Sequence, residues 1–192
     1  MATSDVISAV SESLEARLTA GLGTLGPPAP TAQLHDLVSA VTSDPPTVTL
    51  FLYDIAEDPT VTNRGATTRV AADGSLKIRK QPLGLCLYYM VTAWGGDRHT
   101  EQRLLGRVMQ VLYEDAILDG VELLGVLAGT ATQLNVNLAA LRLEDRARVW
   151  SAIGQTYRLS VNYEVRVADI DAELETGASP VRQRTVASGS RR

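Results

Sequence analysis

The sequence is poor in the residues that build reactive and metal-binding sites. Its 192 residues include one cysteine, Cys86, and two histidines, His35 and His99. A single cysteine excludes an internal disulfide and fits a reducing compartment such as the cytoplasm. A zinc site needs three or four suitably spaced Cys, His or acidic ligands, and the sequence offers no such spacing. The glycine motifs of phosphate-binding, dinucleotide-binding and serine-hydrolase sites are also missing. We therefore expect no metal and no cofactor.

Long apolar runs are missing as well. No stretch of about 18 apolar residues could cross a membrane, and the first residues, MATSDVISAV, lack the basic-then-apolar order of a secretory signal. Aromatic residues make up only 5% of the chain, but hydrophobic residues make up 45% and charged residues 21%. This balance excludes a mainly disordered, collagen-like or disulfide-rich chain. We expect one globular domain with its own core and no membrane partner.

Charge is unevenly distributed, although the net charge is only −4. Residues 1–63 and 81–175 have net charges of −7 and −5, whereas residues 64–80 and 176–192 each carry +4. Such basic segments can dock on acidic protein surfaces, phosphates or anionic lipid, or can be solvated loops. The acidic chain as a whole argues against nucleic acid as a partner. The basic residues that we take as candidate interface residues are Arg64, Arg69, Lys77, Arg79, Lys80, Arg182 and Arg184.

Apolar periodicity predicts an α+β protein with three main helices packed on a mixed, mainly antiparallel sheet. The helices are expected from about Ser4 to Gly21, over 98–118 and over 144–153. The stripe of the second helix includes Met109 and Ile117, which we expect to be buried with its other apolar residues. A short helical turn is expected within residues 32–42.

Strands are expected over 47–53, 83–94 and 157–167, with two shorter strands between 121 and 142. Residues 83–94 are apolar at both alternating sets of positions, as in a central strand covered on both sides. Residues 157–167 alternate without a slip, so this strand has one polar face, which presents Arg158 and Arg166 as further interface candidates. Residues 54–74 are predicted to form a long loop or ragged hairpin. We expect a single domain over 1–171 and a flexible basic tail over 172–192.

Catalysis is not supported by the reactive residues that are present. Cys86 lies in the middle of a strand, where a small buried hydrophobic residue is the ordinary interpretation. The alternative, an unrecognised cysteine enzyme, would require Cys86 to meet His99 in space. Glu114 and Asp115 are adjacent on a helix and point about 100° apart, so they form a poor acid–base pair. We predict that the chain is not an enzyme.

Several motifs resemble one family when taken together. They are Thr92-Ala93-Trp94, the run from Glu101 to Gly106, Leu112-Tyr113, Leu143-Glu144-Asp145, the run from Val149 to Gly154, and the strand from Tyr157 to Val167. With Asp5-Val6-Ile7 and the strand Leu50-Phe51-Leu52-Tyr53, they resemble the cap, or tail-terminator, proteins of contractile injection systems. The resemblance spans roughly residues 4–170.

The resemblance implies a tail-terminator-like fold and a structural function. Members of that family form a six-fold ring that closes the distal end of an inner tube and an outer sheath. The implied partners are therefore further copies of the chain, the tube protein and the sheath protein, in a particle assembled in the bacterial cytoplasm and released from it. The alternative is another structural adaptor of the same particle, at the baseplate or between tube and sheath.

Overall fold

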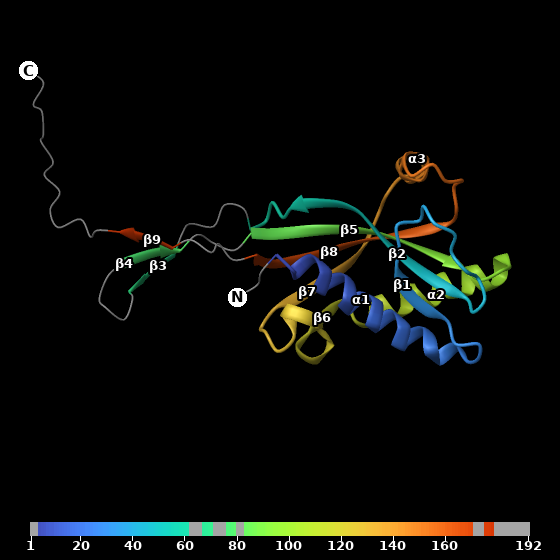
Figure 1. Ribbon diagram of the computed structural model, residues 1–192, viewed down its shortest axis with the longest axis horizontal. Coiled ribbons are helices and arrows are strands. Elements are labelled where there is room, and N and C mark those ends of the chain that lie inside the picture. The colour runs from blue at the N-terminus through green and yellow to red at the C-terminus, as the bar shows by residue number, and fades with distance from the viewer. Residues whose placement is uncertain (1–3, 62–66, 71–75, 80–82, 171–174, 179–192) are drawn as a thin grey trace, which may run out of the picture.

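The helices and strands account for most of the chain (Figure 1). The computed structural model describes residues 4–61, 67–70, 76–79, 83–170 and 175–178. Its helices are α1 (Val6–Leu22), α2 (Arg98–Glu114) and α3 (Leu143–Ala152), with short 3₁₀ turns at Gly23–Leu25, Gly120–Glu122 and Gly125–Leu127. Its strands are β1 (Thr31–Leu34), β2 (Thr47–Glu57), β3 (Thr67–Val70), β4 (Leu76–Arg79), β5 (Leu83–Trp94), β6 (Ile117–Asp119), β7 (Gln133–Ala139), β8 (Ser160–Ile170) and β9 (Glu175–Ala178). None of the described helices combines the length and apolarity that a membrane crossing requires.

Six strands form the main sheet, in the order β1-β2-β5-β8-β7-β6. All neighbours in it are antiparallel except β1, which runs parallel to β2. At the centre of the sheet, Met90 of β5 lies opposite Phe51 on one side and Asn162 on the other. The predicted α+β fold with three main helices and a mainly antiparallel sheet is confirmed.

One face of the main sheet, the inner face, is buried under α1 and α2. Alternate residues of β5, from Leu85 to Ala93, enter this core together with Tyr163, Val165 and Val167 of β8. The polar end of one core side chain is satisfied, since the Tyr89 hydroxyl shares a 2.8 Å hydrogen bond with Ser11 of α1. The alternation predicted for 157–167 therefore identifies the core residues Tyr163, Val165 and Val167, but Tyr157 and Leu159 of the same set precede β8 and are exposed.

The opposite face, the outer face, is partly covered by α3, which lies on the other side of the sheet from α1 (Figure 1). Trp150 of α3 is 1% exposed and packs in a second apolar cluster with Leu37 and Met90. This cover buries Ser160, whose carbonyl oxygen accepts a 3.0 Å hydrogen bond from Arg146 of α3. The polar face predicted for residues 157–167 is thus only partly open, because a helix packs over one end of it.

The region predicted as a helical turn within 32–42 instead begins with the end of strand β1. Every second backbone amide of β1 donates a hydrogen bond to β2, and two of the other amides donate hydrogen bonds to side chains of α1. The Ala32 amide donates to Thr19 Oγ1 at 3.0 Å, and the Leu34 amide donates to Glu15 Oε2 at 3.3 Å. Contacts between segments distant in sequence therefore override the local preference, and α1 shields a sheet edge that would otherwise be open.

A second, three-stranded sheet has the order β3-β4-β9, and we call it the small sheet. It lies beyond the ends of β5 and β8 in Figure 1. The segment predicted as a loop or ragged hairpin over 54–74 contributes β3, after β2 has continued to Glu57. Within the predicted tail over 172–192, residues 175–178 supply the third strand, and residues 179–192 lie outside the described residues.

Candidate docking surfaces

Cys86 lies in an environment that favours the neutral thiol. Its side chain is buried, at 2% exposure, and its sulfur is 4.0 Å from Glu164 Oε1. Burial, followed by the nearby carboxylates of Asp58 and Glu164, raises the pKa of the Cys86 thiol. A catalytic thiol needs the opposite shift, because the thiolate is the nucleophile.

The two members of the conceivable Cys86–His99 pair are held apart by the fold. Cys86 is near the start of β5, and His99 follows the far end of that strand, in the first turn of α2. Eight strand residues from Cys86 to Trp94 span about 26 Å at roughly 3.3 Å per residue. The described residues also contain no group of three or more His, Cys, Asp or Glu side chains that could hold a metal ion.

The uncovered part of the outer face carries Arg166, one of the predicted interface residues. Its Nε donates to Glu164 Oε1 on the same strand, and this bond raises the pKa of the Arg166 guanidinium. The Tyr53 and Tyr88 rings lie next to this pair of charges, with their centroids 6.2 Å apart. A shallow hollow of about 370 Å³ continues from Arg166 toward Asp58. Tyrosine and arginine are enriched at the energetic centres of protein interfaces, so this area is a candidate docking surface.

Arg158, the other candidate on this segment, is engaged within the chain. Its guanidinium carbon lies 4.1 Å from the centre of the Trp94 ring, and the guanidinium forms an ion pair with Glu101 of α2. Glu101 also accepts a 2.8 Å bond from Arg98. These contacts give Arg158 a role in joining the segment before β8 to α2, and its part in an interface stays a prediction.

The small sheet brings three of the predicted basic residues to one face. Arg69 is opposite Lys77, and Arg79 is opposite Thr67 on one side and Glu175 on the other. Because strand positions alternate between faces, the basic positions share one face. The opposite face is formed by Thr68, Val70, Leu76, Ile78, Thr176 and Ala178. The remaining predicted residues, Arg64, Lys80, Arg182 and Arg184, lie outside the described residues.

An apolar groove of about 480 Å³ lies between α2 and β7, and we call it the α2–β7 groove. Met109, Tyr113 and Leu138 line it, and they are 39%, 85% and 56% exposed. Ile117, just after α2, is 53% exposed. The prediction that Met109 and Ile117 are buried is wrong, because α2 ends at Glu114 and only its inner side faces the core. Adjacent exposed apolar side chains of this size mark interaction sites.

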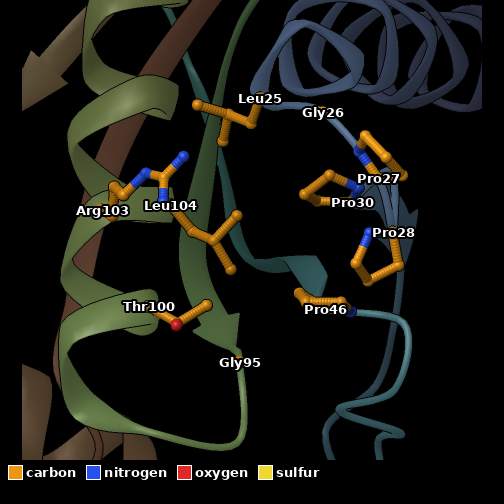
Figure 2. A pocket seen from close by; sticks show the side chains of 10 residues that line it. All are labelled: Leu25, Gly26, Pro27, Pro28, Pro30, Pro46, Gly95, Thr100, Arg103 and Leu104. Carbon is orange, nitrogen blue, oxygen red and sulfur yellow. The ribbon is translucent and has the colours of Figure 1, made fainter.

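A smaller pocket of about 220 Å³ lies between the segment that follows α1 and the first turns of α2 (Figure 2). One wall contains Pro27, Pro28, Pro30 and Pro46, and Leu104 and Arg103 face them from α2. Prolines fix the backbone and make this wall stiff. Since Arg103 is the only ionisable lining residue, the pocket has no acid–base pair. Sequence reasoning treated the Pro-rich segment only as a link, and nothing in the sequence indicates which residues complete the pocket.

The described residues therefore form an α+β fold that presents several apolar and charged surfaces, and no catalytic constellation is found among them. The chain belongs to the Pvc16 N-terminal domain family, whose model matches residues 9–184. A comparison with curated proteins found no significant match to this chain.

Two solved structures share the fold over almost the whole chain. One is the sheath/tube terminator of an extracellular contractile injection system, PVC, in its extended state, with a TM-score of 0.64 and 20% identity over 99% of this chain. The other is the tube-terminating cap of the anti-feeding prophage, with a TM-score of 0.59 and 20% identity over 98% of this chain. Both were determined by cryo-electron microscopy. This chain covers 65% and 62% of those two chains.

Proposed function

We propose that the chain is a structural subunit of a cap that terminates the inner tube and sheath of a contractile injection system. The observation that carries the proposal is the fold match over 99% of the chain to a sheath/tube terminator. Membership of the Pvc16 N-terminal domain family supports it further. A cap acts through docking surfaces rather than through chemistry, and the surfaces of the described residues suit that role.

Termination follows from an asymmetry between the two faces of such a cap. The growing end of a helical polymer exposes an unfilled binding surface. A terminator binds that surface but offers a different one on its far side, so that no further subunit can add. Six copies in a ring, as the family resemblance implies, repeat a modest contact six times and gain avidity. A ring closes when a head-to-tail interface has a rotation that returns to the start.

Removal of the protein tests this function directly. In a strain that lacks the gene, we expect tubes and sheaths of uncontrolled length with open distal ends in electron micrographs, and normal particles after complementation. Labelling the chain should place it at the distal end of the particle. A label at the baseplate would favour the adaptor alternative, and particles of normal length with closed ends in the deletion strain would refute the proposal.

The basic face of the small sheet is our candidate for contact with acidic groups of the tube or of adjacent cap subunits. Its motivation is the charge of +4 within residues 64–80 of an otherwise acidic chain. We expect Lys77→Glu with Arg79→Glu to reduce the fraction of capped particles at least tenfold at low salt, and the difference from the unaltered chain should shrink at high salt because salt screens both the attraction and the introduced repulsion. The matched control is Arg98→Glu with Arg148→Glu, two residues with side chains 76% and 80% exposed. Normal capping by the Lys77 and Arg79 variant would contradict this assignment.

We assign the segment with Arg182 and Arg184 to the last layer of the sheath, where an extended segment could add a strand to a sheet edge. Removing residues 179–192 in the same micrographs should release the sheath from a tube that is still capped. Unchanged sheath attachment would argue against this role.

A further inference from the structure

The apolar face of the small sheet has no apolar cover among the described residues. Ile78 at its centre is 38% exposed, and neither hydrophobic cluster of the main body includes Ile78 or Leu76. Three strands of four residues each are close to the lower limit for an independently stable sheet. A sheet with one apolar face is stabilised when that face packs against another surface. Because no described residue covers this face, a partner surface would stabilise the small sheet.

The α2–β7 groove is an uncovered apolar surface on the same chain, and Gly106 lies next to it on the same face of α2. Gly106 lies inside α2, is exposed, and has no atom within 4 Å of the position where a Cβ would lie. Glycine within a helix costs about 1 kcal/mol relative to alanine, and no packing within the described residues explains it. Gly106 shares a helix face with Met109 and Tyr113, at spacings of three and seven. The missing side chain leaves open space on α2 about one turn before the groove residues Met109 and Gln110, so another backbone can approach the helix there.

The two surfaces do not meet within one chain. In Figure 1 the small sheet lies beyond the Leu83 end of β5, whereas the groove includes Tyr163, which is paired with Tyr89 in the middle of that strand. No described part of the chain occupies either surface, which leaves both of them open to another molecule. A second copy of the chain supplies both halves of the contact, and a contact between two different surfaces is of the head-to-tail kind that builds rings.

We propose that the apolar face of the small sheet of one copy docks into the α2–β7 groove of the next copy. This inference rests on the proposed function and names the subunit contact within the cap. The charges agree with it, since exposed Glu114 accepts a hydrogen bond from the groove residue Gln110 and the docking sheet carries Arg69, Lys77 and Arg79. The basic positions are on the face opposite the docking face, so their charges attract the acidic groups through the thickness of the sheet. Such attraction persists over about one Debye length, roughly 8 Å at physiological salt.

The area of the small sheet shows why closure of a ring matters. Strands of four residues are about 13 Å long, and three of them are about 14 Å wide, so one face covers roughly 200 Å². The contact then buries about 400 Å² in total, well below the roughly 1,200 Å² of a stable pairwise interface. We therefore expect this contact to hold in a closed ring, where each copy makes it twice and other contacts add to it.

Cysteine cross-linking tests the contact in particles that carry the full chain. Ile78→Cys and Tyr113→Cys place one thiol on each proposed surface at exposed positions, and native Cys86, 2% exposed, contributes little background. With a short thiol–thiol cross-linker, the double variant should give a ladder of multimers on a denaturing gel. Each single variant should give at least tenfold less. The matched control is the double variant Ile78→Cys with Leu143→Cys. Leu143 lies on α3 and is 60% exposed, and this control should give no ladder.

A Gly106→Gln variant separates docking from folding. Glutamine is a better helix former than glycine, so the melting temperature should stay the same or rise. The added side chain should nevertheless obstruct the groove and lower the fraction of capped particles at least tenfold. Unchanged capping by Gly106→Gln would overturn the inference.

The cross-linking outcomes also distinguish this inference from the proposed function. A dimer formed by Ile78→Cys alone would show that two small sheets meet each other, which overturns the docking. Particles that carry the chain at the distal end but give no ladder would overturn the docking and leave the cap function intact. A chain that never joins particles would overturn both.

Discussion

Replacing Trp150 by alanine should strongly destabilise the protein, because this side chain anchors α3 to the outer face of the main sheet. Trp150 is 1% exposed and packs against Leu37 and Met90. A fully buried tryptophan removes about 250 Å² from water, which at about 25 cal/mol per Å² corresponds to about 6 kcal/mol as an upper limit. Measured truncations of large aromatic residues cost about 3–5 kcal/mol. That loss is a large share of the 5–15 kcal/mol that typically separates folded from unfolded protein.

Urea denaturation followed by circular dichroism measures this loss as a fall in the free energy of unfolding of about 3–5 kcal/mol. The melting temperature should fall by about 6–20 °C for a chain of this size. The control is Leu143→Ala on the same helix, 60% exposed, which should change stability by less than about 0.5 kcal/mol. A loss below about 1 kcal/mol for Trp150→Ala would show that α3 is not held by this contact, and the described cover of the outer face would be wrong.

Two further perturbations test the inner face. Gly21→Ala should lower the free energy of unfolding by about 1–3 kcal/mol, since the new Cβ would lie 2.5 Å from Val111 Cγ2, and Val111→Ala in the same chain should restore part of the loss. The second perturbation is alkaline pH, because burial raises the pKa of both Tyr89 and Tyr163 to about 12. The folded state holds these protons more tightly than the unfolded state, whose tyrosines titrate near 10. Stability should therefore be intact below pH 10 and should fall as pH rises from about 10 to about 12. Urea titrations across this range should show a shallower fall for Tyr163→Phe, and an unchanged slope would contradict the burial of that hydroxyl.

Much of the fold could be predicted from local patterns. The alternation along residues 157–167 identifies the β8 residues that enter the inner core, because a period of two admits only one division between faces. The apolar run over 83–94 predicted a central strand, which β5 is. The helix α2 begins where predicted because Asp97 accepts bonds from the His99 and Thr100 amides, a capping arrangement that depends on nearby residues alone. The order of these elements was sufficient to predict an α+β architecture with a mainly antiparallel sheet.

Elements that depend on distant partners were predicted poorly. Strand β1 is stabilised by β2 and by Thr19 and Glu15 of α1, and nothing within residues 31–34 indicates these partners. The third strand of the small sheet comes from residues 175–178, which have too few apolar residues to order alone and do so beside β4. The pocket in Figure 2 joins prolines on both sides of β1 to α2, so it exists only after the chain has folded.

The sequence by itself determined the alternation over 157–167, the apolar central strand over 83–94, the amphipathic helices and the concentration of positive charge in two segments, because each follows from neighbouring residues. Tertiary structure decided which apolar residues remain uncovered. Met109 and Tyr113 belong to the same amphipathic helix as the buried Val108 and Leu112, yet they are exposed and line a groove between α2 and β7. Exposure depends on what packs against a residue from elsewhere in the chain, and that information is not local.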